Sequence, residues 1–296
     1  MVFLHPLSLP RPLLVIALAL ACYAVQAAAG ENNAQALLAS SRPLVIAHRG
    51  YSSAAPENTL ASFRLALASG ADLVEFDYHH SRDGVPVVIH DATLDRTTDA
   101  VARWGGKALR VADRSAAELG ELDAGRWFDG RSGVRLPLLA ETLDLICSGG
   151  SMPLIERKAG DAATLARLLR GRGLVNRVVV QSYDWNFLRE LHEQLPEQVL
   201  AALGAPHERH HGAAPLRDGQ PDASVWDELA ACGVRVIVWD RGLTAANIAA
   251  AHERGLKVWI YTIDDPALVR ELRTRGADGF ITNNAAILWK TLGESR

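Results

Sequence analysis

The sequence contains little cysteine, with Cys22, Cys147 and Cys232 the three among its 296 residues. Cys22 falls within an apolar N-terminal segment, so two thiols remain in the body of the chain. A protein of this size with two thiols does not depend on a disulfide framework, even in an oxidising compartment. We therefore expect both thiols to be free.

An excess of basic residues is also absent, because 31 lysines and arginines stand against 34 aspartates and glutamates. Nucleic-acid-binding faces are strongly basic, so the composition predicts no nucleic-acid partner. After residue 30 no run is long and apolar enough to span a bilayer. With 49% hydrophobic and 22% charged residues, the chain fits one large α/β barrel or two small domains.

The first 30 residues differ in composition from the rest. Arg11 is their only charged residue, and an apolar run over 13–25 is followed by a stretch of small residues. This order is typical of a secretory signal peptide over 1–29, with cleavage after Ala27 or Ala29. We therefore expect an exported protein, either periplasmic or secreted, with no stable membrane insertion once the leader is cleaved.

Two alternatives to a cleaved leader stay open. An uncleaved membrane anchor is one, although the apolar run is short for a membrane span. Lipid attachment at Cys22 is the other and is less favoured, because the residues before it match a lipoprotein processing site poorly. Loss of Arg11 on cleavage would make the formal net charge of −3 one unit more negative.

Short apolar runs that alternate with amphipathic segments organise the residues after the leader. Pro56 is expected to open a helix with Glu57, Asn58 and Thr59 in its first turn, and Gly70 to end it. Strands are predicted at 44–48, 73–77, 85–89, 152–157, 177–182, 198–203, 234–239, 256–262 and 278–282. The later helices are predicted at about 139–147, 161–172, 185–195, 223–231, 243–254 and 265–275.

The run at 85–89 cannot be a further parallel strand. Only a few residues containing Asp83-Gly84 separate it from the strand that ends at Asp77, whereas a parallel crossover needs a dozen or more. It must return antiparallel as a hairpin, which leaves eight parallel strands. Eight such strands close a TIM (β/α)8 barrel, with a small, partly irregular subdomain inserted after the second strand, at about 92–136, that holds one short helix around 115–122.

Polar residues gather at the ends of the first strands. His48 and Arg49 follow the first strand, and His90 follows the hairpin strand. Glu75 and Asp77 share one face of the second strand, because side chains two apart in a strand point the same way. Buried carboxylates need a metal or cation partner. A histidine pair, convergent carboxylates and a cation suit acid–base chemistry on an anionic substrate with a divalent metal.

The third parallel strand adds two residues to this set. Glu156 and Lys158 share a face by alternation, while Arg157 points towards helices or solvent. Glu156 is a candidate third metal carboxylate, and Lys158 a candidate cation for a phosphate or substrate. A purely structural salt bridge between Glu156 and Lys158 is the alternative.

Other polar clusters carry less weight. His207, His210 and His211 lie in a Gly/Pro-rich stretch and are interpreted as a solvated loop rather than a metal site. Gly105-Gly106 is too weak a pattern for a nucleotide-binding loop.

The motifs taken together resemble the glycerophosphodiester phosphodiesterase family over roughly 43–290, within a predicted domain at 42–290. They are AHRG at 47–50, PENT at 56–59, EFD at 75–77, DGVPVVIHD at 83–91, LDRTTD at 94–99, IERK at 155–158 and DGFIT at 278–282. The resemblance implies a TIM barrel with a carboxylate-held divalent metal. It also implies hydrolysis of glycerophosphodiesters, which are small-molecule substrates, to glycerol 3-phosphate and an alcohol.

Residue by residue, the resemblance implies that Glu75, Asp77 and Glu156 bind the metal. It makes His48 and His90 the acid–base pair. It assigns the phosphate to Arg49 and Lys158. The chain departs from the usual family pattern at Arg157, at Asn283, where aspartate is usual, and near Tyr261, where a tryptophan is common.

Three carboxylates form a hard oxygen site that favours Ca²⁺ or Mg²⁺ over zinc. One histidine would complete deprotonation of the glycerol 2-hydroxyl or a water, and the other would protonate the leaving alcohol. We first take His90 as the base and His48 as the acid, an order that the sequence leaves open, as it does the oligomeric state. The alternative functions are a lysophospholipase D-like phosphodiesterase and a non-catalytic exported binding protein.

Overall fold

The computed structural model describes residues 33–130, 133–204 and 219–293. The predicted leader at 1–29 and the histidines at 207, 210 and 211 lie outside these residues. Within the described chain, no helix combines the length and the apolar composition needed to cross a bilayer.

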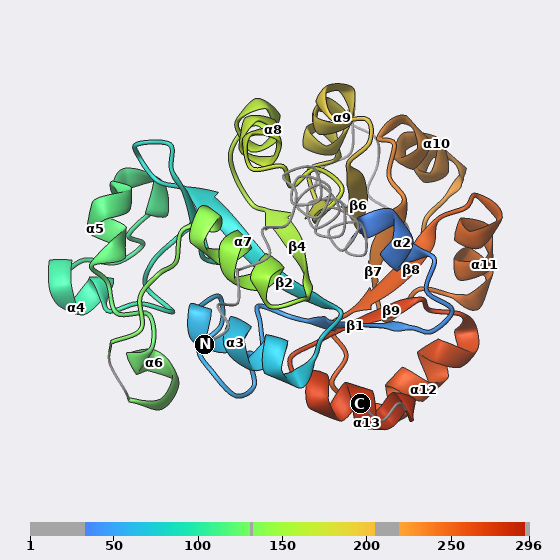
Figure 1. Ribbon diagram of the computed structural model, residues 1–296, viewed down its shortest axis with the longest axis horizontal. Helices are drawn as coiled ribbons and strands as arrows, with labels where there is room; N and C mark the ends of the chain where they lie inside the picture. The colour runs from blue at the N-terminus through green and yellow to red at the C-terminus, as the bar shows by residue number, and fades with distance from the viewer. Residues whose placement is uncertain (1–32, 131–132, 205–218, 294–296) are drawn as a thin grey trace, which may run out of the picture.

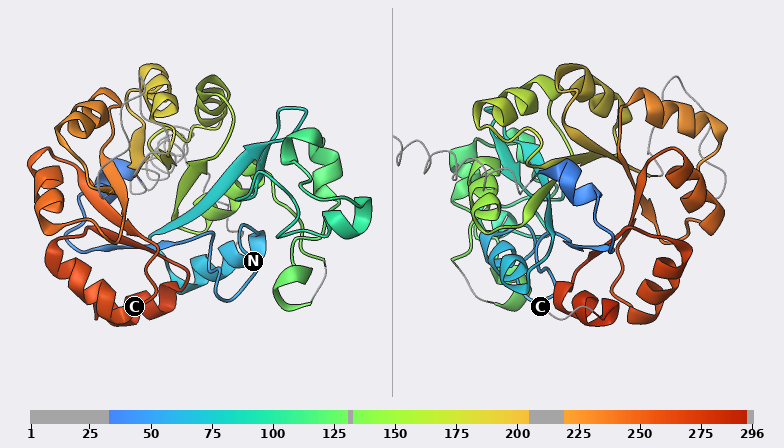
Figure 2. Two further views of the ribbon diagram at one scale, coloured as in Figure 1. Left: turned by 180° about the vertical axis from the view of Figure 1, so that it is seen from behind. Right: turned by 45° about the vertical axis from the view of Figure 1, so that its right-hand side comes forward.

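Eight parallel strands form a closed ring with helices around it, so the predicted TIM barrel is confirmed (Figures 1 and 2). The strand order is β1-β9-β8-β7-β6-β5-β4-β2, and a β1–β2 pairing closes the ring. The parallel strands are β1 (Leu44–Ala47), β2 (Leu73–His80), β4 (Met152–Arg157), β5 (Val179–Ser182), β6 (Val199–Leu203), β7 (Val236–Asp240), β8 (Lys257–Tyr261) and β9 (Gly279–Thr282).

Helices cover the outside of this ring (Figure 2). They are α3 (Leu60–Ser69), α7 (Leu139–Ser148), α8 (Ala162–Gly171), α9 (Trp185–Gln194), α10 (Ala223–Ala231), α11 (Ala245–Glu253), α12 (Pro266–Arg275) and α13 (Ala285–Leu292). The last of these was not predicted from the sequence. A cap begins most of them, as where the Asp184 carboxylate accepts from the Phe187 N–H at the start of α9.

Strand alternation divides the core into two layers. Side chains such as Val45 and Phe76 pack outwards under the helices, whereas Ile46 and Leu73 fill the barrel interior. Helix α2 (Ala34–Leu38) joins the interior cluster through Ala34 and Leu38 and covers one end of the ring. The covered end is the one where the strands begin, so the other end is left for polar side chains.

The hairpin prediction is confirmed. Strand β3 (Pro86–Val88) runs antiparallel to the outer end of β2, with Tyr78 opposite Val88 and His80 opposite Pro86. Beyond it, Ile89 N–H donates to the Asp77 carbonyl at 3.0 Å. The strand therefore returns to the mouth of the barrel just before His90.

The described residues of this insertion, 92–130 and 133–136, stand beside the barrel around a hydrophobic cluster, which includes Leu94, Val111 and Leu119 (Figure 1). More short helices form here than the one expected. They are α4 (Ala100–Trp104), the 3₁₀ turn η1 (Val111–Asp113), α5 (Ala116–Gly120) and α6 (Arg126–Asp129). Each is too short to show a clear helical period in the sequence, which is why only the capped α5 was predicted.

The helix expected to open at Pro56 begins instead at Leu60. Thr59 is its N-cap, and Thr59 and Ser62 form a reciprocal capping box. Asn58 has a φ of 57°, a left-handed conformation that no first turn of an α-helix contains. The expectation failed because Asn58 is held outside the helix by a contact with the second strand.

Candidate active site

The turn after β1 carries the first polar residues of the site. His48 follows the strand directly, and Arg49 and Gly50 both have positive φ, at 52° and 79°. A side chain at Gly50 would lie 2.5 Å from the Ser62 hydroxyl, so only glycine fits. This tight turn directs the Arg49 backbone N–H to Glu75 Oε2 at 2.8 Å.

Three carboxylates converge inside the mouth of the barrel. Glu75 and Asp77 come from β2, and Glu156 from the adjacent β4, where it pairs in register with Asp77. One oxygen from each lies within 4.8 Å of the others, and all three residues are buried. Oxygen donors at this spacing are able to hold a divalent cation.

Two cations lie against this cluster. Lys158 Nζ contacts Asp77 Oδ1 at 3.2 Å and also forms an ion pair with Glu156. Arg49 Nε lies 3.5 Å from Asp77 Oδ2, and Arg49 Nη1 donates to Glu57 Oε1 at 2.8 Å. Both cations stand at the rim of the carboxylate cluster, where a phosphate could contact them.

The charges around each carboxylate set its pKa. Burial alone would raise the pKa of Asp77, but Lys158 and Arg49 hold it below its usual value. Burial and the charges of the other two carboxylates raise the pKa of Glu75. The pKa of Glu156 is raised by burial and by Asp77. The cluster thus holds more negative charge than its two cations neutralise, and a bound cation would relieve this repulsion.

Two amides that the sequence analysis did not select hold the carboxylates in place. Asn58 Nδ2 donates to Asp77 Oδ2 at 2.9 Å, and the Asp77 N–H donates to Asn58 Oδ1 at 3.2 Å. Gln181 on β5 donates to Glu156 Oε2 at 3.3 Å and reaches Glu75 Oε1 at 3.5 Å. Gln181 follows two valines in a buried strand, the same signal that drew attention to Glu75.

The two histidines lie at the same mouth with different partners. His48 Nδ1 is 2.7 Å from Asn283 Oδ1, and His90 Nδ1 is 2.6 Å from Asp91 Oδ1. Burial and the Arg49 charge lower the pKa of His48 to about 4. Burial also lowers the pKa of His90, although Asp77 and Asp91 oppose this.

The partner of His90 is held from the inserted segment. Arg96 donates through Nε to Asp91 Oδ2 at 2.7 Å and through Nη2 to Asp91 Oδ1 at 3.0 Å. The same guanidinium donates to both oxygens of Glu57, at 2.7 and 3.0 Å. The Nε2 atom of another histidine, His79, lies 3.0 Å from the His90 carbonyl oxygen. These contacts fix His90 from both the backbone and the side chain.

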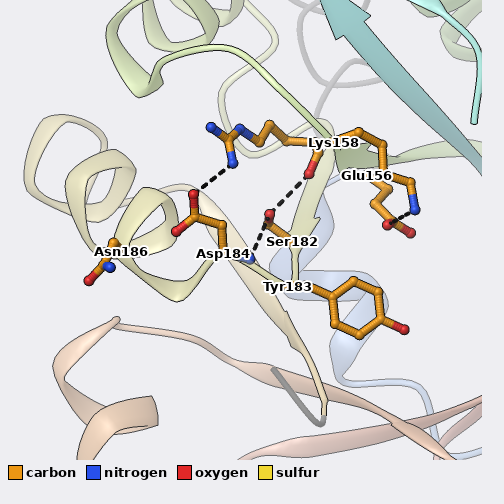
Figure 3. Close-up of a pocket in the computed structure, with 7 residues that line it drawn as sticks. Glu156, Lys158, Ser182, Tyr183, Asp184 and Asn186 are labelled. Carbon is orange, nitrogen blue, oxygen red and sulfur yellow. Dashed lines mark hydrogen bonds and ion pairs between the residues drawn. The ribbon is translucent and has the colours of Figure 1, made fainter. Parts of the chain in front are cut away.

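A cavity of about 400 Å³ encloses the reacting groups. His48, Arg49, Glu75, His90, Glu156 and Lys158 line it, together with Gln181, Tyr183, Leu203, Tyr261, Thr262 and Ile281. Tyr183 donates from its hydroxyl to the Tyr261 hydroxyl at 2.8 Å, and Tyr261 donates to the Gly204 carbonyl at 2.6 Å. Glu156, Lys158 and Tyr183, which are labelled in Figure 3, also line a second hollow.

All seven residues selected from the sequence therefore lie at one mouth of the barrel. Six of them line the same cavity, and the seventh, Asp77, lies buried beneath it in contact with Arg49 and Lys158. Arg157 points away from the cluster, as expected from alternation, and pairs with Asp184 at 2.8 Å.

Comparisons with known proteins agree with this geometry. The model of the glycerophosphoryl diester phosphodiesterase family matches residues 48–287. A glycerophosphodiester phosphodiesterase of Bacillus subtilis (strain 168) is 28% identical over 92% of this chain and 93% of its own length. One from Bacillus altitudinis is 30% identical over 81% of this chain and 94% of its own.

Among solved structures, the chain is similar to an Oleispira antarctica phosphodiesterase in complex with the product sn-glycerol-3-phosphate. The TM-score is 0.73 at 26% identity, and the match covers 86% of this chain and 98% of the other.

Proposed function

The chain belongs to the glycerophosphoryl diester phosphodiesterase family and is a glycerophosphodiester phosphodiesterase, and on that premise we propose that its hydrolysis of glycerophosphodiesters requires a divalent cation held by Glu75, Asp77 and Glu156. The convergence of these three buried carboxylates carries the proposal. The raised pKa values of Glu75 and Glu156 support it, because they reflect a repulsion that a dication would remove.

The donor set suits Ca²⁺ or Mg²⁺, because all three candidate ligands are carboxylate oxygens. Such an ion, when bound, would neutralise charge on the phosphoryl oxygens and lower the pKa of a hydroxyl or water beside it. Gln181 and Asn58 keep the carboxylates oriented for this role.

Arg49 and Lys158 would bind the phosphate. Both side chains are partly exposed at the cavity, and both form ion pairs with Asp77. A phosphodiester placed against them would lie in the cavity that His48 and His90 also line. Positioning and electrostatic stabilisation of the phosphoryl oxygens are the main contributions that a protein makes to phosphoryl transfer.

We assign the base to His48 and the acid to His90, the reverse of the order first taken from the sequence. His48 Nδ1 donates to an amide oxygen, which leaves Nε2 unprotonated in the neutral ring and able to accept a proton from the glycerol 2-hydroxyl or a water. His90 faces the Asp91 carboxylate, which stabilises its protonated form. The deprotonated oxygen forms a bond to phosphorus as the phosphorus–oxygen bond to the alcohol breaks, and His90 gives its proton to the departing oxygen. Where the 2-hydroxyl attacks, a water then opens the resulting cyclic phosphate to give glycerol 3-phosphate.

Release of glycerol 3-phosphate from glycerophosphocholine tests the proposal. Purified protein should release it with added Ca²⁺ or Mg²⁺, and a chelator should stop the reaction until excess cation is returned. Turnover that survives exhaustive chelation would contradict the metal requirement. We further propose that residues 1–29 are a cleaved leader and that the mature domain at 42–290 is exported. Its partner would be a small-molecule glycerophosphodiester. N-terminal sequencing of the exported protein tests the leader.

A further inference from the structure

A second hollow of about 460 Å³ opens directly beside the catalytic cavity (Figure 3). The two share Glu156, Lys158 and Tyr183 as lining residues. The second hollow extends outwards over the ends of β4 and β5 to the start of α9. We call it the outer hollow, and its remaining lining residues are Arg157, Ser182, Asp184 and Asn186.

A phosphodiester has two substituents on one phosphorus, and in the described part of the barrel mouth the catalytic cavity and the outer hollow meet at Lys158. A phosphate bound to Lys158 therefore stands at their junction. The catalytic cavity contains Glu75, His48 and His90, so a glycerol hydroxyl can meet the carboxylates and the base there, and the ester oxygen that His90 protonates also stays in this lobe. The rest of the leaving alcohol, beyond its ester oxygen, is left with the outer hollow.

Most side chains of the outer hollow are polar. Of its lining residues that the structure describes, Tyr183 is aromatic and none is aliphatic. The Ser182 hydroxyl donates to the Arg157 carbonyl at 3.0 Å and accepts from the Asp184 N–H at 3.1 Å. An acyl chain would have to bury these polar groups against it, so a lysophospholipid fits the hollow poorly.

The charges of the outer hollow are largely paired with one another. Arg157 Nη1 donates to Asp184 Oδ2 at 2.8 Å, and its guanidinium stacks over the Phe187 ring at 4.6 Å. Asp184 Oδ1 accepts from the Phe187 N–H at 3.1 Å. The Asp184 carboxylate is thus already bound to the Arg157 guanidinium and to the first turn of α9. The Glu156 carboxylate, which also lines the hollow, is paired with Lys158. A cationic alcohol would therefore meet Arg157 and Lys158 but, among the described lining residues, no carboxylate without a cationic partner.

Asn186 supplies a neutral polar group at the outer end. Its Oδ1 accepts from Arg189 Nη2 at 2.8 Å, so the amide NH₂ is the group it can offer to a bound hydroxyl. Resting on the proposed function, we propose that the outer hollow is the subsite for the leaving alcohol, and that the preferred alcohol is uncharged and rich in hydroxyls, as glycerol and inositols are.

The test compares three substrates with metal present: glycerophosphoglycerol, glycerophosphocholine and lysophosphatidylcholine. The unmodified protein should hydrolyse glycerophosphoglycerol with a kcat/KM about tenfold or more above that for glycerophosphocholine. Asn186→Leu should lower kcat/KM for glycerophosphoglycerol about fivefold, the loss expected for about one hydrogen bond. The loss should fall on KM, with glycerophosphocholine changed less than about twofold.

Ala246→Leu is the matched control, because Ala246 is the exposed second residue of α11 as Asn186 is of α9. It should leave all three substrates unchanged. Equal or better turnover of glycerophosphocholine, an equal loss on both diesters in Asn186→Leu, or preferred hydrolysis of lysophosphatidylcholine would each overturn the subsite. If neither diester releases glycerol 3-phosphate, the proposed function fails and the subsite fails with it.

Discussion

The Nδ1 atom of His48 lies 2.7 Å from the amide oxygen of Asn283, and this contact fixes which nitrogen of the imidazole carries the proton. The amide cannot rotate freely, because its Nδ2 donates to Asp264 Oδ2 at 2.6 Å. Asp264 is in turn held by the Asn283 N–H and the Thr282 hydroxyl, both at 2.8 Å. The Ser52 hydroxyl also donates to the Asn283 oxygen. Asp264 therefore sets the tautomer of His48 through a neutral side chain.

This arrangement predicts that Asp264→Asn and Asn283→Asp each lower kcat about tenfold or more. In the first variant the Asn283 amide is free to turn its NH₂ towards His48. In the second, two carboxylates face each other and one must keep a proton. The double variant Asp264→Asn/Asn283→Asp restores a donor and acceptor pair, so its kcat should recover most of the loss.

The double variant should also shift the pH dependence of kcat/KM in one direction. A carboxylate at 283 favours the protonated imidazole, so the pKa of His48 should rise from its lowered value of about 4. The acidic limb of kcat/KM should therefore move to higher pH. Additive losses in the double variant, or an acidic limb that moves down, would show that Asp264 does not act through Asn283.

The carboxylate cluster predicts opposite effects on metal binding and on stability. Glu75→Gln removes a buried charge from a repelling set, so the metal-free protein should unfold at an equal or higher temperature than the unmodified protein. Added Ca²⁺ or Mg²⁺ should raise the Tm of the unmodified protein and not that of the variant. Glu141→Gln, at an exposed glutamate of α7, is the control.

Turnover gives the same cluster a second readout. Glu75→Ala, Asp77→Ala and Glu156→Ala should each abolish metal-dependent turnover while the protein still folds. Full activity in one of these variants would remove that residue from the ligand set, whatever its effect on Tm.

The contact between Arg96 and Asp91 predicts that the inserted segment positions His90. His90→Ala should lower kcat about 10²-fold, the usual effect of losing a general acid. Arg96→Ala should lower kcat about tenfold, because Asp91 and Glu57 lose the cation that joins them. In the double variant the two losses should not add. Arg103→Ala, which removes another exposed arginine of the insertion, should leave kcat unchanged. A fully additive double variant would mean that Arg96 acts on something other than His90.

Much of this fold could be predicted because it depends on local pattern and chain length. Alternating apolar runs marked the strands, and the few residues between Asp77 and Pro86 required a hairpin. The same alternation placed Glu75, Asp77 and Glu156 on inward faces at the ends of their strands. These relations hold within one strand or between neighbours in the chain.

The partners of the site residues could not be predicted, because they come from distant segments. The sequence pattern placed Asn58 in the first turn of a helix. Its contact with Asp77 depends on the three-dimensional fold. Asp264 is 216 positions after His48 in the sequence and acts through a third residue. Arg96 belongs to a stretch without periodicity. A local sequence pattern does not show which of these distant residues come into contact.

The two thiols test the arrangement of the helices. Cys147 is partly buried in α7, Cys232 is buried after α10, and both are free. Burial raises the pKa of both, that of Cys232 to about 11. Both should react slowly in the native protein. Titration of the denatured, unreduced mature protein should find two reactive thiols, and a Cys147–Cys232 disulfide would be incompatible with this barrel.

Helix α2 makes the two ends of the barrel different. It closes the end of the barrel opposite the reactive mouth, and its first N–H, from Ala34, donates to the Asn176 carbonyl in the loop before β5. The described chain therefore begins, at Asn33, on the closed face. A tag or partner domain joined to the chain at Asn33 would therefore be attached on the side away from the substrate opening.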